Sequence, residues 1–284
     1  MITYKRCSEV ENDLVYQAFR DGFSDYMIQF NLTKDQFIQQ FFGPEGNATE
    51  HSFIAFHGDD PVGLMLGGIK NYENVKTIRC GALALSPSYR GLGISNELFI
   101  MHKEEAIKHD CRQLFLEVIV GNDRAIKFYQ KLGYEKVYDI SFFSLRDLSK
   151  LKDTPPSKEI TVSRISFQEF ELAVDRWKYF HINWQNDIDF MREIKNDVYY
   201  GAYVQEKLVG CLCINNIGKI SCIIVDRDVR GKGVATHLLY SAHKELEFVK
   251  MSIAFPNNGL LAGFLKHIGF KKDSIAQYEM YLTL

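Results

Sequence analysis

Apolar and polar positions follow two periods along the first half of the chain, one typical of helices and one typical of strands. Apolar residues recur at helical spacing between about residues 9 and 23, and Thr33 and Gln36 form a capping box before a second helical pattern. Apolar runs predict strands at 2–5, 52–56, 62–69, 75–85, 114–120 and 137–145. The order is therefore a strand, two helices, a strand meander and then two strand–helix turns.

The first of these two turns joins the strand that ends near Leu85 to a helical pattern that begins at Ile94. Its loop reads Arg90-Gly91-Leu92-Gly93. Glycines permit a tight turn and leave backbone N–H groups uncovered, and a helix start adds unpaired N–H groups and the positive end of a dipole. Such a loop suits a phosphate or pyrophosphate, although two glycines before a helix are often only a turn.

The second turn follows a strand in which Val118 and Val120 alternate with their neighbours. The strand ends at Gly121-Asn122, and Asp123 stands where a helix cap belongs. Apolar positions then recur at helical spacing up to residue 132, and Gly133 is expected to end that helix.

Together the two turns resemble those of the GNAT superfamily of acyl-CoA-dependent N-acyltransferases. That family carries R-x-x-G-x-G/A at the first turn and N-x-x-A-x-x-x-Y-x-x-x-G-[FY] at the second. Residues 90–95 read RGLGIS, with Ser95 in a position that is usually glycine or alanine, and residues 122–134 read NDRAIKFYQKLGY, which fits throughout. Both motifs in this order, about 30 residues apart, make the resemblance specific.

The resemblance implies an α/β fold (an α+β mixed sheet), in which a mostly antiparallel sheet flanked by helices has a splayed coenzyme-binding strand pair. It implies that acetyl-CoA is the acyl-donor substrate and that no metal is needed. The residues expected to contact the coenzyme are Leu83, Ala84, Leu85, Arg90, Gly91, Leu92, Gly93, Ile94, Ser95, Asn122, Ala125 and Phe128.

The same resemblance assigns proton transfer to Glu117 and Tyr129. An amine must be neutral to attack a thioester, and deprotonation at pH 7 costs roughly 4–5 kcal/mol for a lysine-like amine but only about 1 kcal/mol for an α-amine. Family members use a glutamate at the position of Glu117 to take the amine proton through water, and the motif tyrosine to protonate the coenzyme A thiolate. The structural alternatives are an ion pair for Glu117, a core position for Tyr129 and a simple turn for Asn122.

The acceptor side of the site is less defined. The bend after the first helix contains Phe23, Asp25, Tyr26 and Phe30. In this family that bend borders the acceptor cleft, so the aromatic residues are expected to line it and Asp25 to attract an amine. The alternative is a packed core under a loop. The run LEVIVGN at 116–122 looks like that of the ribosomal-protein N-terminal acetyltransferases.

The second half repeats the plan of the first. Residues 230–235 read RGKGVA, and residues 258–270 align with residues 122–134. At the positions of Glu117 and Tyr129 stand Ile253 and Leu265, which cannot transfer a proton. We therefore expect a catalytic module at 1–148, a charged, proline-containing linker at 149–159 and a diverged module at 160–284 that binds acyl-CoA, shapes the cleft or forms a dimer surface.

Composition narrows the remaining possibilities. The 284 residues are 46% hydrophobic and 25% charged with a net charge of −2, so neither half has the basic excess of a nucleic-acid binder. No apolar run is long enough to cross a membrane, and the N-terminus lacks a signal-peptide core. The six cysteines read as buried thiols of a reducing compartment, so a cytoplasmic protein is expected. The histidines show no metal-ligand spacing, and His102 and His109 are expected to face solvent.

These observations predict an N-acetyltransferase that moves an acetyl group directly from acetyl-CoA to a primary amine. No motif for an acyl-enzyme is present, and no GxSxG or P-loop motif suggests hydrolysis. The acceptor is either a small-molecule amine or a peptide N-terminus, and the sequence does not distinguish a monomer from a homodimer. The alternative is a non-catalytic acyl-CoA-binding or sensor protein that keeps two coenzyme loops.

Overall fold

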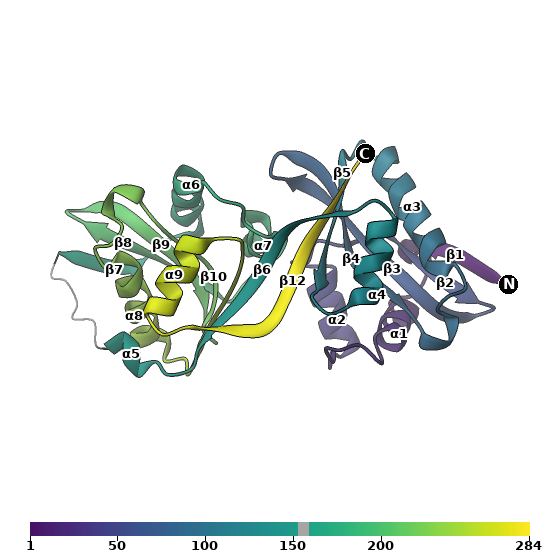
Figure 1. Cartoon of the computed structure of the whole chain (residues 1–284), viewed down its shortest axis with the longest axis horizontal. Coiled ribbons are helices and arrows are strands. Elements are labelled where there is room, and N and C mark those ends of the chain that lie inside the picture. Colours follow the sequence, from purple (N-terminus) through teal and green to yellow (C-terminus); the bar gives the residue numbers. More distant parts are fainter. Residues whose placement is uncertain (153–158) are drawn as a thin grey trace. The chain divides into compact units, whose positions relative to one another are not determined.

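The computed structural model describes residues 1–152 and 159–284, which form two compact units (Figure 1). The first unit comprises Met1–Val137 together with Tyr278–Leu284, and the second comprises Tyr138–Gln277. Of the expected linker, residues 153–158 lie outside the described residues, while its first residues form the short helix α5 (Ser149–Lys152).

The first unit is a mixed sheet with helices on both faces. Its strands lie in the order β1-β2-β3-β4-β5, followed by the end of β12, and only β4 and β5 of the first five run parallel. Its elements are β1 (Ile2–Arg6), η1 (Cys7–Glu9), α1 (Asn12–Gly22), α2 (Lys34–Phe41), β2 (Ala48–His57), β3 (Asp60–Tyr72), β4 (Val75–Leu85), η2 (Pro87–Tyr89), α3 (Ile94–Lys108), β5 (Gln113–Ile119), α4 (Asp123–Lys131) and β12 (Lys271–Thr283).

Both faces of this sheet are buried, which explains why its strands read as continuous apolar runs. On β2, Ile54 and Phe56 join the core that contains the buried faces of α1 and α2. Phe53 and Ala55, which alternate with them, join the core of α3 and α4. The expected capping box at the start of α2 is present, since Thr33 Oγ1 accepts from Gln36 N at 3.3 Å and Gln36 Oε1 accepts from Thr33 N at 2.9 Å.

The parallel pair β4 and β5 separates towards its carboxyl end, as the fold predicted from the sequence requires. Their pairing runs from Thr77 opposite Gln113 to Cys80 opposite Leu116 and then stops. Strand β4 nevertheless continues to Leu85 and β5 to Ile119. The ends of two neighbouring strands therefore leave backbone groups between them that another molecule can reach.

The second unit repeats this arrangement, with strands in the order β6-β11-β10-β9-β8-β7. Its parallel pair is β10 and β11, in which Lys219 lies opposite Ser252 and Ile220 opposite Ile253. Its elements are β6 (Glu135–Leu145), α5, β7 (Ile160–Arg164), α6 (Phe167–Trp177), η3 (Trp184–Asn186), α7 (Ile188–Glu193), β8 (Asp197–Val204), β9 (Lys207–Asn215), β10 (Lys219–Val225), η4 (Arg227–Val229), α8 (Val234–Leu246), β11 (Met251–Pro256) and α9 (Gly259–His267). Among the described residues, no helix has the length and apolar character needed to cross a membrane.

The unit boundaries differ from the expected modules, because the last strand of each half belongs to the other unit. Residues Ile140–Leu145 of β6 pair antiparallel with β11. In return, the end of β12 contributes the buried Met280 to the core of α3 and α4, and the Tyr281 ring lies 4.9 Å from that of Phe115. An alternating apolar pattern satisfies either pairing equally well, so the pattern does not reveal this exchange.

Candidate active site

The loop between β4 and α3 is built around two glycines in the left-handed region. Gly91 has a φ of 79° and Gly93 has a φ of 83°, values that L side chains rarely adopt. A Cβ at either position would meet no atom within 4 Å, so this stretch of backbone borders open space. Gly93 also directly precedes α3, whose first N–H groups have no intrahelical acceptors. The geometry is that of an anion-binding turn.

The side chain of Arg90 fastens this loop to its surroundings. Its guanidinium donates to the carbonyl oxygens of Leu85 and Gly22, each at 3.1 Å, and to both carboxylate oxygens of Asp25, each at 2.6 Å. These hydrogen bonds lower the pKa of Asp25. The charges of Asp25 and Arg90 therefore neutralise each other. For this reason we do not assign Asp25 to the amine site, and we do not expect the side chain of Arg90 to contact a phosphate.

A cavity of about 380 Å³ lies beside the loop, between the ends of the splayed strands and the bend after α1. The expected site residues that line it are Phe23, Tyr26, Leu83, Ala84, Leu85, Arg90, Gly91, Gly93, Ser95, Asn122, Ala125, Phe128 and Tyr129. Sequence reasoning missed Gly22, Asn96 and Arg124, which line it as well. Arg124, in the first turn of α4, adds a positive charge to the cavity. It occupies a variable position of the second motif, so the motif does not identify it.

Five expected residues do not line this cavity. Leu92 is exposed at the loop, Ile94 is buried in the core under α3, and Asp25 is held by Arg90. Phe30 lines a neighbouring hollow and packs against Phe19 and Phe23, with ring centroids 5.4 and 5.2 Å apart. The fifth is Glu117, described below.

Asn122 combines a structural and a lining position. Its Oδ1 accepts from Ala125 N at 3.3 Å and so caps α4. Burial raises the pKa of the Tyr26 hydroxyl, and the nearby side chain of Asn122 opposes this shift. The bend after α1 thus lies close to the second motif at Tyr26 and is joined to the first by the ion pair of Asp25.

Tyr129, on α4, lines the cavity. The residue is 7% exposed, and its oxygen lies 3.9 Å from the sulfur of Cys80 on β4. Burial raises the pKa of Tyr129 well above 10, so the phenol stays protonated at neutral pH. Burial also raises the pKa of Cys80 to about 12, which makes this thiol a poor nucleophile.

Glu117 lies in a buried ion-pair cluster and does not line the cavity. Its Oε2 accepts from Arg79 Nη2 at 2.7 Å and from Arg79 Nε at 2.8 Å, and Arg79 Nη1 donates to Glu45 at 2.8 Å. Among the described residues, Oε1 of Glu117 has no hydrogen-bond partner. Burial raises its pKa to about 7 despite the opposing effect of Arg79. Glu117 therefore forms the ion pair that was the structural alternative, and its pKa also lies near neutrality.

The second unit contains a similar but larger cavity, of about 550 Å³, beside the loop at Arg230. It is lined by Gly231, Gly233 and Asn258, the counterparts of cavity or loop residues in the first unit. Leu265, at the position of Tyr129, is fully buried in the core. This cavity therefore has the coenzyme-loop geometry but neither of the two proton-transferring side chains.

Two of the histidines differ from expectation. His102, expected to face solvent, is fully buried on the inner side of α3, because its position repeats one turn after Leu98 and Phe99. Its pKa falls to about 3 through burial, so the ring is neutral. His109 is only half-exposed and lies against Glu105 and His51.

The chain matches a family of known enzymes in both halves. A model of the acetyltransferase (GNAT) family matches residues 13–134 and again residues 164–270. The probable N-acetyltransferase san of Drosophila melanogaster is 35% identical over 92 residues, which are 32% of this chain and 50% of that protein. N-alpha-acetyltransferase 30 of Saccharomyces cerevisiae is 25% identical over 108 residues, which are 38% of this chain and 61% of that protein. The chain thus spans half to about three fifths of these relatives.

Solved structures extend the likeness to the whole chain. A tandem GNAT protein from the clavulanic acid biosynthesis pathway has a TM-score of 0.72 at 16% identity, over 100% of this chain and 98% of that one. A GCN5-related N-acetyltransferase from Sphaerobacter thermophilus has a TM-score of 0.68 at 13% identity, over 99% and 95%. At these identities the likeness concerns the fold, and it confirms the tandem arrangement expected from the sequence.

Proposed function

Because the chain belongs to the acetyltransferase (GNAT) family, we propose that its first unit moves an acetyl group from acetyl-CoA to a primary amine. The observation that carries this proposal is the position of Tyr129, a residue that lines the same cavity as the loop glycines and Asn122 and stays protonated at neutral pH. In this proposal Tyr129 is the proton donor for a thioester bound to that loop.

The coenzyme is held mainly by backbone in this proposal. The N–H groups from Gly91 to Ser95 and the start of α3 receive the pyrophosphate, since the side chain of Arg90 is engaged by Asp25. The free backbone of β4 beyond Cys80 pairs with the amide groups of the pantetheine arm. Arg124 supplies a nearby positive charge for the remaining phosphate oxygens.

The reaction is a direct displacement. The amine nitrogen forms a bond to the thioester carbonyl carbon, and the carbon–sulfur bond breaks, giving an amide and the thiol of coenzyme A. The proton lost by the amine passes through water to Glu117, which releases it to solvent, and Tyr129 protonates the departing thiolate and regains a proton from solvent. The raised pKa of Cys80 argues against a cysteine acyl-enzyme in this cavity.

Among acceptors, we favour the α-amine of a peptide. The relatives include a protein named N-alpha-acetyltransferase 30, and residues 116–122 carry the LEVIVGN run. An α-amine is also easier to deprotonate than a lysine-like amine, because its deprotonation at pH 7 requires only about 1 kcal/mol. This suits a base that reaches the cavity only through water.

The test is a turnover assay with acetyl-CoA and two sets of amines, peptides with free N-termini and small molecules such as polyamines and aminoglycosides. We expect N-acetylated peptide, detected by mass spectrometry, and an equal amount of free coenzyme thiol. Peptides blocked at the N-terminus serve as the control. Tight calorimetric binding of acetyl-CoA without product from any amine would instead support a binding or sensor protein.

A further inference from the structure

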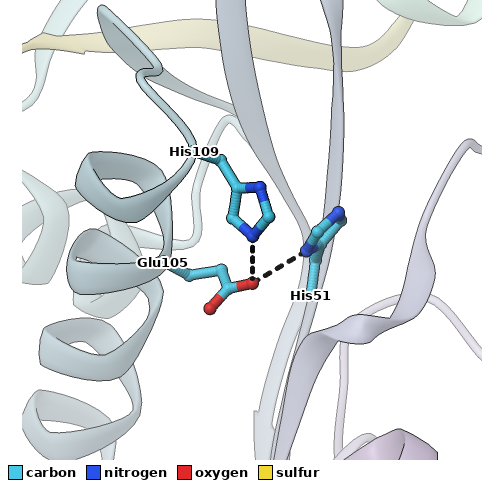
Figure 2. A group of neighbouring side chains, drawn as sticks. All are labelled: His51, Glu105 and His109. Atoms are coloured by element: carbon cyan, nitrogen blue, oxygen red, sulfur yellow. Dashed lines mark hydrogen bonds and ion pairs between the residues drawn. The ribbon is translucent and has the colours of Figure 1, made fainter.

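A group of three potential metal ligands lies on the face of the first unit that carries α3. Figure 2 shows His51, on β2, Glu105, in the last turn of α3, and His109, which directly follows that helix, with both imidazole rings directed at one carboxylate oxygen. Glu105 Oε1 lies 2.9 Å from His51 Nδ1 and 3.0 Å from His109 Nε2. His51 is 54 residues from Glu105 in the sequence, and His109 follows Glu105 by about one helical turn. The sequence alone therefore does not identify the three residues as a group.

The spacing of these three atoms suits a small divalent cation. Four ligands at zinc–nitrogen and zinc–oxygen distances of about 2.1 Å lie roughly 3.3 Å from one another in a tetrahedron. The two distances from Glu105 Oε1 are slightly shorter, and all three ligand atoms lie within 4.8 Å of one another. Small rotations of the two rings would therefore admit an ion in place of the hydrogen bonds.

The surroundings support such a site. Glu105 is 3% exposed and its second oxygen, Oε2, accepts from Arg6 Nη2 at 2.6 Å, which fixes the carboxylate and leaves Oε1 for the ion. Carboxylates that bind a metal ion are usually held in place by hydrogen bonds from neighbouring groups. The side chains of His51 and His109 are 21% and 36% exposed, so an ion and its water ligand can enter from solvent.

We propose that His51 Nδ1, Glu105 Oε1 and His109 Nε2 bind one Zn²⁺ ion, with water completing the tetrahedron. Two imidazoles and one carboxylate favour Zn²⁺ over Mg²⁺ or Ca²⁺, which prefer oxygen ligands. The ion would be structural, since Glu105 lies 12 residues, or about 18 Å, along α3 from Gly93. It would link β2 to the end of the helix whose beginning forms the coenzyme loop.

The test uses the full chain, stripped of metal with a chelator and titrated with ZnCl₂ by calorimetry. We expect one Zn²⁺ per chain, a higher melting temperature in its presence, and with Co²⁺ the visible absorption of a tetrahedral complex. His51→Ala and His109→Ala should each weaken binding by about 100-fold or more, because even outer partners of a metal site contribute 10- to 100-fold.

The matched control is His57→Ala, which removes an exposed imidazole from the same strand, where it lies against the ring and hydroxyl of Tyr89. This variant should bind Zn²⁺ like the wild type. Circular dichroism of the metal-free variants checks that each is folded. No binding to the folded wild type at 100-fold excess of Zn²⁺, or equal affinity in the wild type and His109→Ala, would overturn the proposal and leave the group a hydrogen-bonded cluster.

Discussion

The two units share the backbone of the coenzyme loop in detail. Gly91 and Gly93 have φ values of 79° and 83°, and Gly231 and Gly233 have 75° and 83°. In both units the loop arginine donates through Nε to the carbonyl at the end of the preceding strand, at 3.1 Å for Arg90 and 3.2 Å for Arg230. An asparagine caps the helix of the second motif in each case.

The units differ in the side chains that could move protons. Where the first has Glu117 and Tyr129, the second has Ile253 and Leu265, both buried in its core. Glycine conformations and helix caps therefore preserve the loop backbone in the second unit without counterparts of Glu117 and Tyr129. This is the physical reason why an intact loop motif indicates binding and does not by itself indicate catalysis.

The loop arginines are also covered differently. Arg90 is held by the carboxylate of Asp25, whereas Arg230 lies under the ring of Tyr179, 4.7 Å from its centroid, and Arg227 lies 3.8 Å from the same ring. An aromatic ring leaves the hydrogen-bond donors of a guanidinium more available than a bidentate carboxylate does. The loop arginine of the second cavity is thus less neutralised by its neighbours than Arg90 is.

The largest effect is expected from blocking one loop at a time. Gly93→Trp places a bulky side chain in the open space beside the first loop, in a backbone conformation that L residues avoid. We expect it to abolish turnover and calorimetric binding of acetyl-CoA to the first unit. The counterpart Gly233→Trp is the matched control and should leave turnover intact. The opposite pattern would show that the proposed catalytic unit is wrong.

A smaller but still large effect is expected from removing one hydroxyl. Tyr129→Phe should lower kcat about 100-fold, the lower end of the range for general acid–base catalysis, and leave acetyl-CoA affinity unchanged. Tyr134→Phe is the control, because the two rings are 5.5 Å apart and the hydroxyl of Tyr134 has no hydrogen-bond partner among the described residues. Equal rates for both variants would contradict the role of Tyr129 as the acid.

Local signals in the sequence were sufficient for the elements and for most of the cavity. The capping box at Thr33 places a helix start correctly, and the glycine and asparagine motifs identify the loop and the α4 cap. These features depend on residues that are neighbours in the chain. The splayed strand pair, expected from the family resemblance, is confirmed by the register of β4 and β5.

Features that depend on distant contacts were not predictable. The exchange of β6 and β12 leaves the alternation of each strand unchanged, so no pattern marks it. The pairing of Asp25 with Arg90 joins residues 65 positions apart. The cluster of His51, Glu105 and His109 joins β2 to α3, and the burial of His102 depends on which face of α3 meets the sheet.

The smallest effect, and the sharpest test of the base, comes from Glu117→Gln. The pKa of Glu117 is about 7, so in the wild type the carboxyl gains a proton, and loses its capacity as a base, as the pH falls through that value. For an α-amine acceptor we expect kcat/KM to fall by no more than about tenfold in the variant at pH 8, since neutralising that amine costs only about 1 kcal/mol even at pH 7. The difference should shrink towards pH 6. Glu45→Gln is the control, because it also disturbs Arg79 but removes no proposed base.

Stability provides an independent readout of the same carboxyl. Its pKa in the folded protein lies above its ordinary value of 4.5, so its contribution to stability is complete below pH 4.5 and declines as the pH rises through 7. The free energy of unfolding of the wild type should therefore fall between pH 5 and pH 8 relative to that of Glu117→Gln. If this stability difference appears while the pH–rate profiles of the two proteins coincide, Glu117 is a structural ion-pair residue, and the amine loses its proton to water alone.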